Sequence, residues 1–101
     1  MIIYKYEIQL KAQEFVLPKG AKILAVQTQH GTPQIWVLFN PEAKTEKRRF
    51  LVYPTGYPFE IELNKKLIHI GTFQLDGGYL VFHLFEEVEK GLVNEREVLL
   101  K

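Results

Sequence analysis

The sequence contains no cysteine and no serine, and Asp76 is its only aspartate. Without cysteine the chain cannot form a disulfide, a thiolate zinc site or a thiol nucleophile. Without serine as well, the usual catalytic triads cannot be assembled, and a hydrolase would depend on a threonine such as Thr55. No apolar run approaches the roughly 18 residues of a membrane-spanning helix, and the N-terminus lacks the features of a signal peptide. We therefore expect a cytoplasmic protein without catalytic residues.

The charge balance is also unremarkable, because 13 basic residues stand against 12 acidic ones and leave a net charge of +1. No overall field attracts the chain to a nucleic acid polymer or an anionic membrane. Its 101 residues, 47% of them apolar, are enough for one core. We expect a single domain over residues 1–101.

Residues 67–86 predict a β-hairpin, since Asp76-Gly77-Gly78 supplies residues that accept the positive φ of a two-residue turn. A Gly77-Gly78 loop pairs Phe73 with Phe82 and keeps one face apolar. An Asp76-Gly77 loop shifts these pairs along the strands but keeps the same residues on each face. A three-residue loop would move the apolar residues of the second strand to the other face, so the pattern favours the two-residue turn.

The remaining strands are indicated by apolar residues that alternate with polar ones and are interrupted by proline and glycine. With the hairpin, the expected strands cover residues 4–10, 15–17, 21–29, 34–40, 48–53, 59–63, 67–75 and 80–86. Residues 41–47 are expected to form a loop. This pattern predicts a mainly β protein, either a small antiparallel sandwich or a partly open barrel of about seven or eight strands.

The second hairpin, residues 21–40, carries the single tryptophan. With residues 30–33 as its loop, Val26 lies opposite Val37 and Leu24 opposite Phe39, on a face that belongs to the core. The other face holds Trp36 with, among others, Gln27 and Leu38. Either another molecule covers this face, so that these three residues form an interface, or a loop or the C-terminal segment of the same chain does.

Residues 87–101 allow two interpretations, a short helix or an extended arm. Gly91 argues against one continuous helix, so we expect at most one short helix here, in a tail that either docks on the body or stays flexible. A small β-protein must also protect the edges of its sheets, and pairing with a second copy is a common solution. We expect a homo-oligomer.

The histidines do not predict a metal site, and no cofactor is implied. In the expected hairpin, His69 lies on the face of Phe73 and His83 on the opposite face, so the two cannot share an ion. His30 is expected in a distant turn. Glu86 would be the cross-strand neighbour of His69 and could form a pH-sensitive hydrogen bond with it. The glutamates fit solvated surfaces rather than a pair for acid–base catalysis.

One loop region offers chemistry suited to an anion. Arginine forks, phenol hydroxyls and backbone N–H groups beside a glycine can hold a phosphate, and aromatic rings can stack on a base. The candidate ligand-binding residues are Arg48, Arg49, Tyr53, Thr55, Gly56 and Tyr57. Basic and aromatic residues are also common on ordinary β-sheet surfaces, so that a structural role is the alternative.

Several stretches together resemble a family of short, uncharacterised proteins of bacteriophages and prophages. The matching stretches are YKYE from Tyr4, PKGAKIL from Pro18, GTP from Gly31 with Trp36, IGT from Ile70 and LVFHLFE from Leu80. Where that family often has Gly-Thr-Gly, this chain has Pro54-Thr55-Gly56. The resemblance implies a phage-associated accessory protein and transfers no catalytic residue.

Two functional hypotheses follow for a protein acting inside an infected cell. In the first, a non-enzymatic binding protein sequesters a small anionic ligand, such as a cyclic nucleotide signal of host defence, without turnover. In the second, the chain binds or inhibits a host protein through the face that holds Trp36, since aromatic residues are enriched at interface hot spots.

Overall fold

The computed structural model describes residues 1–91, and these residues form seven strands and one short 3₁₀ turn. The elements are β1 (Ile2–Glu7), β2 (Gln13–Pro18), β3 (Lys22–Gln29), β4 (Thr32–Phe39), β5 (Thr45–Pro54), β6 (Lys65–Leu75), η1 (Asp76–Gly78) and β7 (Leu80–Glu89). No helix among these residues is long and apolar enough to cross a membrane.

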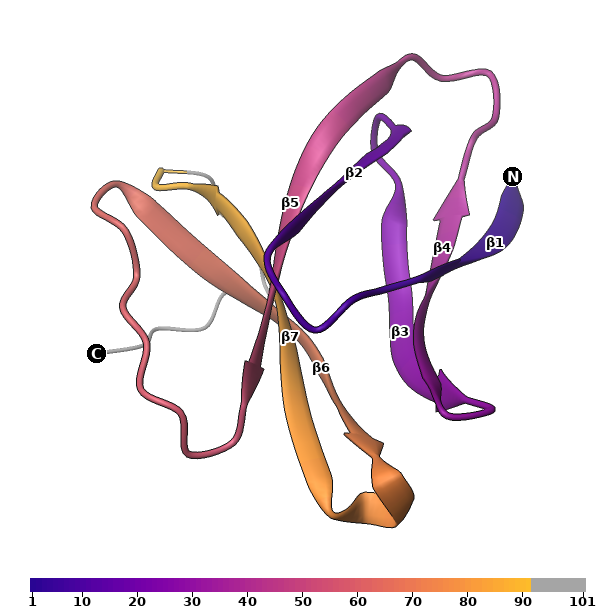
Figure 1. Ribbon diagram of the computed structural model, residues 1–101. Coiled ribbons are helices and arrows are strands. Elements are labelled where there is room, and N and C mark those ends of the chain that lie inside the picture. Colours follow the sequence, from indigo (N-terminus) through magenta and orange to yellow (C-terminus); the bar gives the residue numbers. More distant parts are fainter. Residues whose placement is uncertain (92–101) are drawn as a thin grey trace.

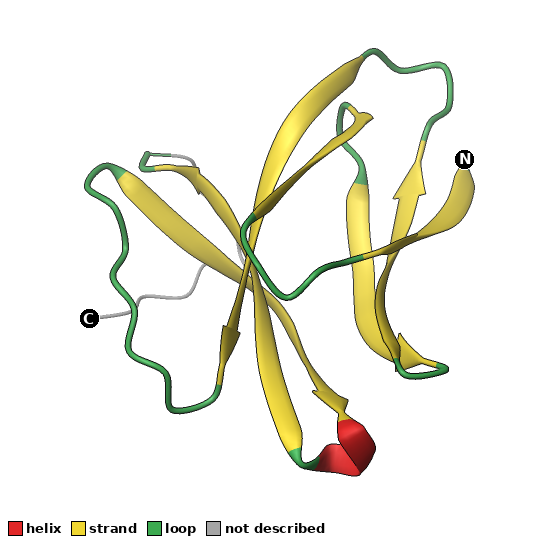
Figure 2. Cartoon of the chain, viewed as in Figure 1, coloured by secondary structure: helices red, strands yellow, loops and turns green. Residues whose placement is uncertain are grey.

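The strands form two antiparallel sheets that pack face to face (Figures 1 and 2). Sheet A has the order β1-β4-β3, and sheet B has the order β2-β5-β7-β6. The sheets do not close into a barrel, so the expected small antiparallel sandwich is confirmed. The expected strand at 59–63 is absent, because residues 55–64 form one loop over sheet B.

The core lies between the two sheets and takes side chains from the inner face of each. Its most deeply buried members include Ile35 and Val37 of β4, and Phe50 and Leu84 of sheet B. Burying one such side chain contributes about 1.5–3 kcal/mol. A second, smaller cluster of Leu51, Leu67 and Phe85 lies on the outer face of sheet B, under the loop 55–64.

The β6–β7 hairpin has the register expected for a Gly77-Gly78 loop, with Phe73 opposite Phe82. Asp76, Gly77 and Gly78 all have positive φ, and the Tyr79 N–H donates to the Asp76 carbonyl at 3.2 Å. This part of the prediction is confirmed.

Nearer the start of β6 the expected register is wrong, because Ile70 forms a β-bulge. The extra residue moves every earlier side chain of β6 to the opposite face. His69 therefore lies opposite Phe85 on the outer face, and Glu86 lies opposite Ile68. The proposed contact of His69 with Glu86 is not formed, and His69 shares the outer face with His83.

The β3–β4 hairpin also differs from its prediction. Its loop is His30-Gly31, both with positive φ, which sets Val26 opposite Ile35. A bulge at Leu24 then reverses the faces at the start of β3. As a result Ile23 is buried, whereas Leu24 is 39% exposed.

Several expected strand boundaries were also displaced. The strand 4–10 is replaced by β1, which ends at Glu7, and β5 begins at Thr45, so that part of the expected loop 41–47 is strand. β7 continues to Glu89. The expected short helix and the rest of the tail, from residue 92 onward, lie outside the described residues.

Candidate functional site

Arg48 and Arg49, the basic residues of the predicted anion site, point to opposite faces of β5. Successive side chains of a strand alternate between the two faces of its sheet. Arg48 therefore lies on the inner face, as does Phe50, whereas Arg49 and Tyr53 lie on the outer face. The two guanidinium groups do not converge on one point.

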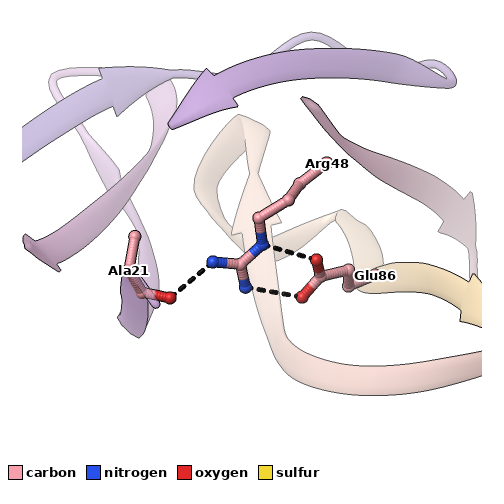
Figure 3. Close-up of polar contacts among 3 residues, drawn as sticks. All are labelled: Ala21, Arg48 and Glu86. Atoms are coloured by element: carbon pink, nitrogen blue, oxygen red, sulfur yellow. Dashed lines mark hydrogen bonds and ion pairs between the residues drawn. The ribbon is translucent and has the colours of Figure 1, made fainter. Parts of the chain in front are cut away.

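Arg48 is fixed by a bidentate ion pair with Glu86 of β7 (Figure 3). Its Nε donates to Glu86 Oε2 at 2.6 Å and its Nη2 to Oε1 at 2.8 Å, while Nη1 donates to the Ala21 carbonyl. The side chains of Arg48 and Glu86 are only 17% and 11% exposed. Hydrogen bonding to Glu86 raises the pKa of Arg48, although burial opposes the change. This guanidinium joins β5, β7 and the start of β3.

A pocket of about 660 Å³ opens beside this ion pair, where sheet B extends beyond sheet A. Its lining includes four basic side chains, among them Lys47 and Lys65, but also five glutamates. Arg49 pairs with Glu87 at 3.2 Å, and Lys65 pairs with Glu89 at 2.5 Å. The excess of carboxylates makes this pocket a poor site for a simple anion.

The other predicted ligand-binding residues lie away from the pocket. The ring of Tyr53 stacks on that of Phe59 with the ring centroids 3.9 Å apart, and burial raises the pKa of the Tyr53 phenol. Gly56 has φ of +82° in a turn in which the Tyr57 N–H donates to the Pro54 carbonyl. The six residues predicted to bind one ligand are thus divided between two faces of the sheet and a loop.

A cluster that the sequence interpretation missed surrounds His83. The Nε2 atom of His83 lies 2.6 Å from the Thr55 hydroxyl, and Nδ1 lies 3.0 Å from the Thr72 hydroxyl. The predicted pairing of Phe73 with Phe82 already placed Thr72 opposite His83, so this half of the cluster could have been found. The contact with Thr55 depends on the course of the loop.

The distance between the Thr55 hydroxyl and Nε2 of His83 is in the range found between a catalytic nucleophile and its general base. Thr55 and Thr72 are nevertheless exposed, and the cluster lies outside the pocket beside Arg48. Among residues 1–91, no group of three or more His, Asp or Glu side chains is placed to hold a metal ion.

The predicted interface residues Trp36, Gln27 and Leu38 do share one face, the outer face of sheet A. Trp36 lies on the central strand β4, between Lys5 of β1 and Ala25 of β3. Leu38 lies opposite Ile3, which is 53% exposed. We call this surface, formed by Ile3, Lys5, Ala25, Gln27, Trp36 and Leu38, the Trp36 face. None of these six side chains belongs to the buried core of residues 1–91 (Figure 1 shows β1, β4 and β3, which carry them).

The comparisons with known proteins identify a family rather than an activity. No curated protein and no solved structure shows a significant match to this sequence. A family model described as a domain of unknown function, DUF7352, matches residues 1–94, and the chain therefore belongs to this family.

Proposed function

We propose that this chain is a non-enzymatic binding protein that recognises another protein through the Trp36 face. The observation that carries the proposal is the uncovered outer face of sheet A, with a tryptophan at the centre of its middle strand. The outer face of sheet B, by contrast, is covered by the chain's own loop.

The chemistry of the Trp36 face suits a protein partner. Trp36 is half-buried and has the small side chain of Ala25 on one side, and Ile3 and Leu24 add exposed apolar surface. Lys5 and Gln27 supply hydrogen-bonding groups around this apolar centre. An aromatic anchor within a polar rim is the usual composition of a protein-binding hot spot.

The biological setting of the proposal comes from the resemblance to phage proteins. We propose that the chain acts in the cytoplasm of an infected bacterium, as a counter-defence protein that blocks a host protein. Such a role needs tight binding and no turnover, which agrees with a sequence that lacks serine and cysteine nucleophiles.

The test compares Trp36→Ala with a matched variant, Tyr79→Ala, in affinity capture from a bacterial host lysate. Tyr79 is an aromatic residue 88% exposed at the tip of the β6–β7 hairpin, far from the Trp36 face in sequence and sheet. We expect one host protein to be retained by the wild type and Tyr79→Ala and lost with Trp36→Ala. That protein, once purified, should bind the wild type in titration at least about tenfold more tightly than Trp36→Ala. Equal binding by the two variants would contradict the proposal.

A second candidate function is sequestration of a small anionic ligand in the pocket beside Arg48. The specific support is the pocket of about 660 Å³ with four basic side chains, three of which are paired with glutamates that a bound anion would have to displace. A phosphate would have to compete with Glu87 for Arg49. Calorimetric titration with cyclic nucleotides should then give heat with the wild type and with Lys5→Gln, but not with Arg49→Gln. No heat with any nucleotide would exclude this form of the function.

A further inference from the structure

Among the described strands, three of the four sheet edges carry features that disfavour pairing with another chain. β2 ends in Pro18, which has no N–H to donate. β3 is bulged at Leu24 and β6 at Ile70, and bulges twist an edge away from a regular ladder. The edges of β3 and β6 also lie near each other, since the Thr28 hydroxyl donates to the Gln74 carbonyl.

The edge of β1 is the exception. β1 contains no proline, and its pairing with β4 is regular from Ile2 to Glu7. It ends sheet A, and no strand of the described chain pairs with its other side. Ile3 and Tyr4 are each 53% exposed there. We propose that this edge pairs antiparallel with β1 of a second copy, forming a two-fold dimer.

The hydrogen bonds to β4 determine which groups β1 offers to a partner. The Ile8 N–H donates to the Pro33 carbonyl at 3.0 Å. In an antiparallel ladder, alternate residues direct both backbone groups to the same neighbour. The backbone groups of Ile3, Lys5 and Glu7 therefore point away from β4, and a dimer must place these residues opposite one another.

Three two-fold registers place two different members of this set opposite each other, and they are centred on Tyr4, Lys5 or Tyr6. The register centred on Lys5 places two lysines directly opposite each other, which is destabilising. The register centred on Tyr6 places Tyr4 opposite Ile8, so the second copy would run along the connection from β1 to β2, beyond the end of β1 at Glu7 and beside the buried Ile8.

The register centred on Tyr4 avoids both problems. It places Tyr4 opposite Tyr4 of the second copy and Ile2 opposite Tyr6, pairs of aromatic and β-branched residues that stabilise a sheet. On the other face, Ile3 lies opposite the aliphatic part of Lys5. The exposed Ile3 and Tyr4 side chains are thereby covered, and this is the register that we propose.

The dimer would form a continuous six-stranded sheet with the order β3-β4-β1-β1-β4-β3. Ile3 and Lys5 stay on the same side as Trp36, so the two Trp36 faces become one surface. The dimer itself does not depend on the function proposed above, because its test measures self-association alone.

The decisive test uses the absence of cysteine from the sequence, since any disulfide must then come from an introduced residue. Residues opposite each other without mutual hydrogen bonds have Cα atoms about 4.5 Å apart, close enough for a disulfide. Under mild oxidation, Tyr4→Cys should form a linked dimer. Lys5→Cys and Tyr6→Cys report the two rejected registers, and Val16→Cys, 60% exposed on the edge of β2, reports random collision.

A second measurement tests self-association without introducing a cysteine into β1. Lys5→Pro removes an N–H that points away from β4, so the fold should persist while the dimer is lost. In sedimentation experiments the wild type should dimerise with increasing concentration, and Lys5→Pro should bind itself at least about tenfold more weakly.

Three results would overturn the proposal. The first is linkage of Val16→Cys as fast as that of Tyr4→Cys. The second is a wild type that stays monomeric while Tyr4→Cys is not linked. The third is protection of the Lys5 amide from hydrogen exchange in a monomer, which would assign the edge to another segment of the same chain.

Discussion

The outer faces of both sheets carry aromatic and aliphatic side chains, but only that of sheet B is covered by a loop of the described chain. On sheet B, Phe59 of the loop 55–64 stacks on Tyr53 and approaches Phe85 at 6.1 Å between ring centroids. On sheet A, Trp36 and Ile3 have no such cover among residues 1–91. An apolar surface that a protein covers itself contributes to its stability, whereas one left open is available for binding.

The comparison also extends to the inner faces. The inner face of sheet A supplies side chains to the core, namely Ile23, Val26, Ile35, Val37 and Phe39, whereas sheet B also carries the Arg48–Glu86 pair, which borders the open pocket. The ion pair marks the boundary between packed core and solvent. Both faces of sheet B therefore hold residues that matter for stability, whereas on sheet A the buried residues lie on the inner face and the Trp36 face has no such cover among residues 1–91.

The largest expected effect comes from removing the same type of side chain from each outer face. Phe85→Ala deletes a buried ring beneath the loop and should lower the free energy of unfolding by about 3–4 kcal/mol. Trp36→Ala deletes a half-buried ring with fewer neighbours and should cost only about 1–1.5 kcal/mol. Urea unfolding of both variants measures the difference. Equal losses would show that Trp36 is as well packed as Phe85.

The ion pair at the boundary should give the next largest effect. Arg48→Met leaves the carboxylate of Glu86, which is 11% exposed, without its partner, and should cost about 3 kcal/mol. The double variant Arg48→Met with Glu86→Leu removes both charges and should recover most of the loss. Urea unfolding of the single and double variants tests this, and a double variant as unstable as the single one would refute it.

The sequence alone predicted the strands better than it predicted the loop that covers the outer face of sheet B. Alternation predicted most of the strands and correctly placed Phe73 opposite Phe82 on one apolar face, which the structure buries in the core. The same alternation misled over residues 59–63, because a loop that anchors Phe59 and Ile61 on a sheet shows the same pattern as a strand.

The errors of register have a different origin. Leu24 and Ile70 are ordinary β-sheet residues, and nothing in their chemistry distinguishes a bulge from a regular pair. Each bulge becomes visible only in the pairing of its strand with the neighbouring one, β3 with β4 and β6 with β7. The role of Arg48 was hidden for the same reason, since Glu86 is 38 residues away and becomes its partner only through the pairing of β5 with β7.

A smaller effect is expected at the seam between the sheets. A Cβ added at Gly71 would lie 2.7 Å from Cγ1 of Val26, so β6 and β3 would have to separate or Val26 change its rotamer. Gly71→Ala should therefore cost about 2 kcal/mol. Adding Val26→Ala should restore part of this loss by making room. Thermal unfolding of the single and double variants measures the coupling, and strictly additive losses would contradict it.

The smallest expected effect is on the pH dependence of stability, and it concerns the covered outer face of sheet B. Burial lowers the pKa of His69, which packs edge-on against Phe85 at 5.4 Å, and the nearby His83 lowers it further. The unfolded chain then binds a proton more readily than the folded one. This contribution to stability is present above the unfolded pKa of about 6.5 and is lost as the pH falls through the lower, folded value.

Replacing His69 should therefore reduce the loss of stability that occurs as the pH falls. The thermal midpoint of His69→Phe should fall less than that of the wild type between about pH 7.5 and 5.5, the window around the unfolded value. His30→Asn, in the exposed turn between β3 and β4, is the matched control and should fall as much as the wild type. If His69→Phe loses as much stability as the control, protonation of His69 does not loosen the covered face, and the acid response must originate in the carboxylates that both sheets carry.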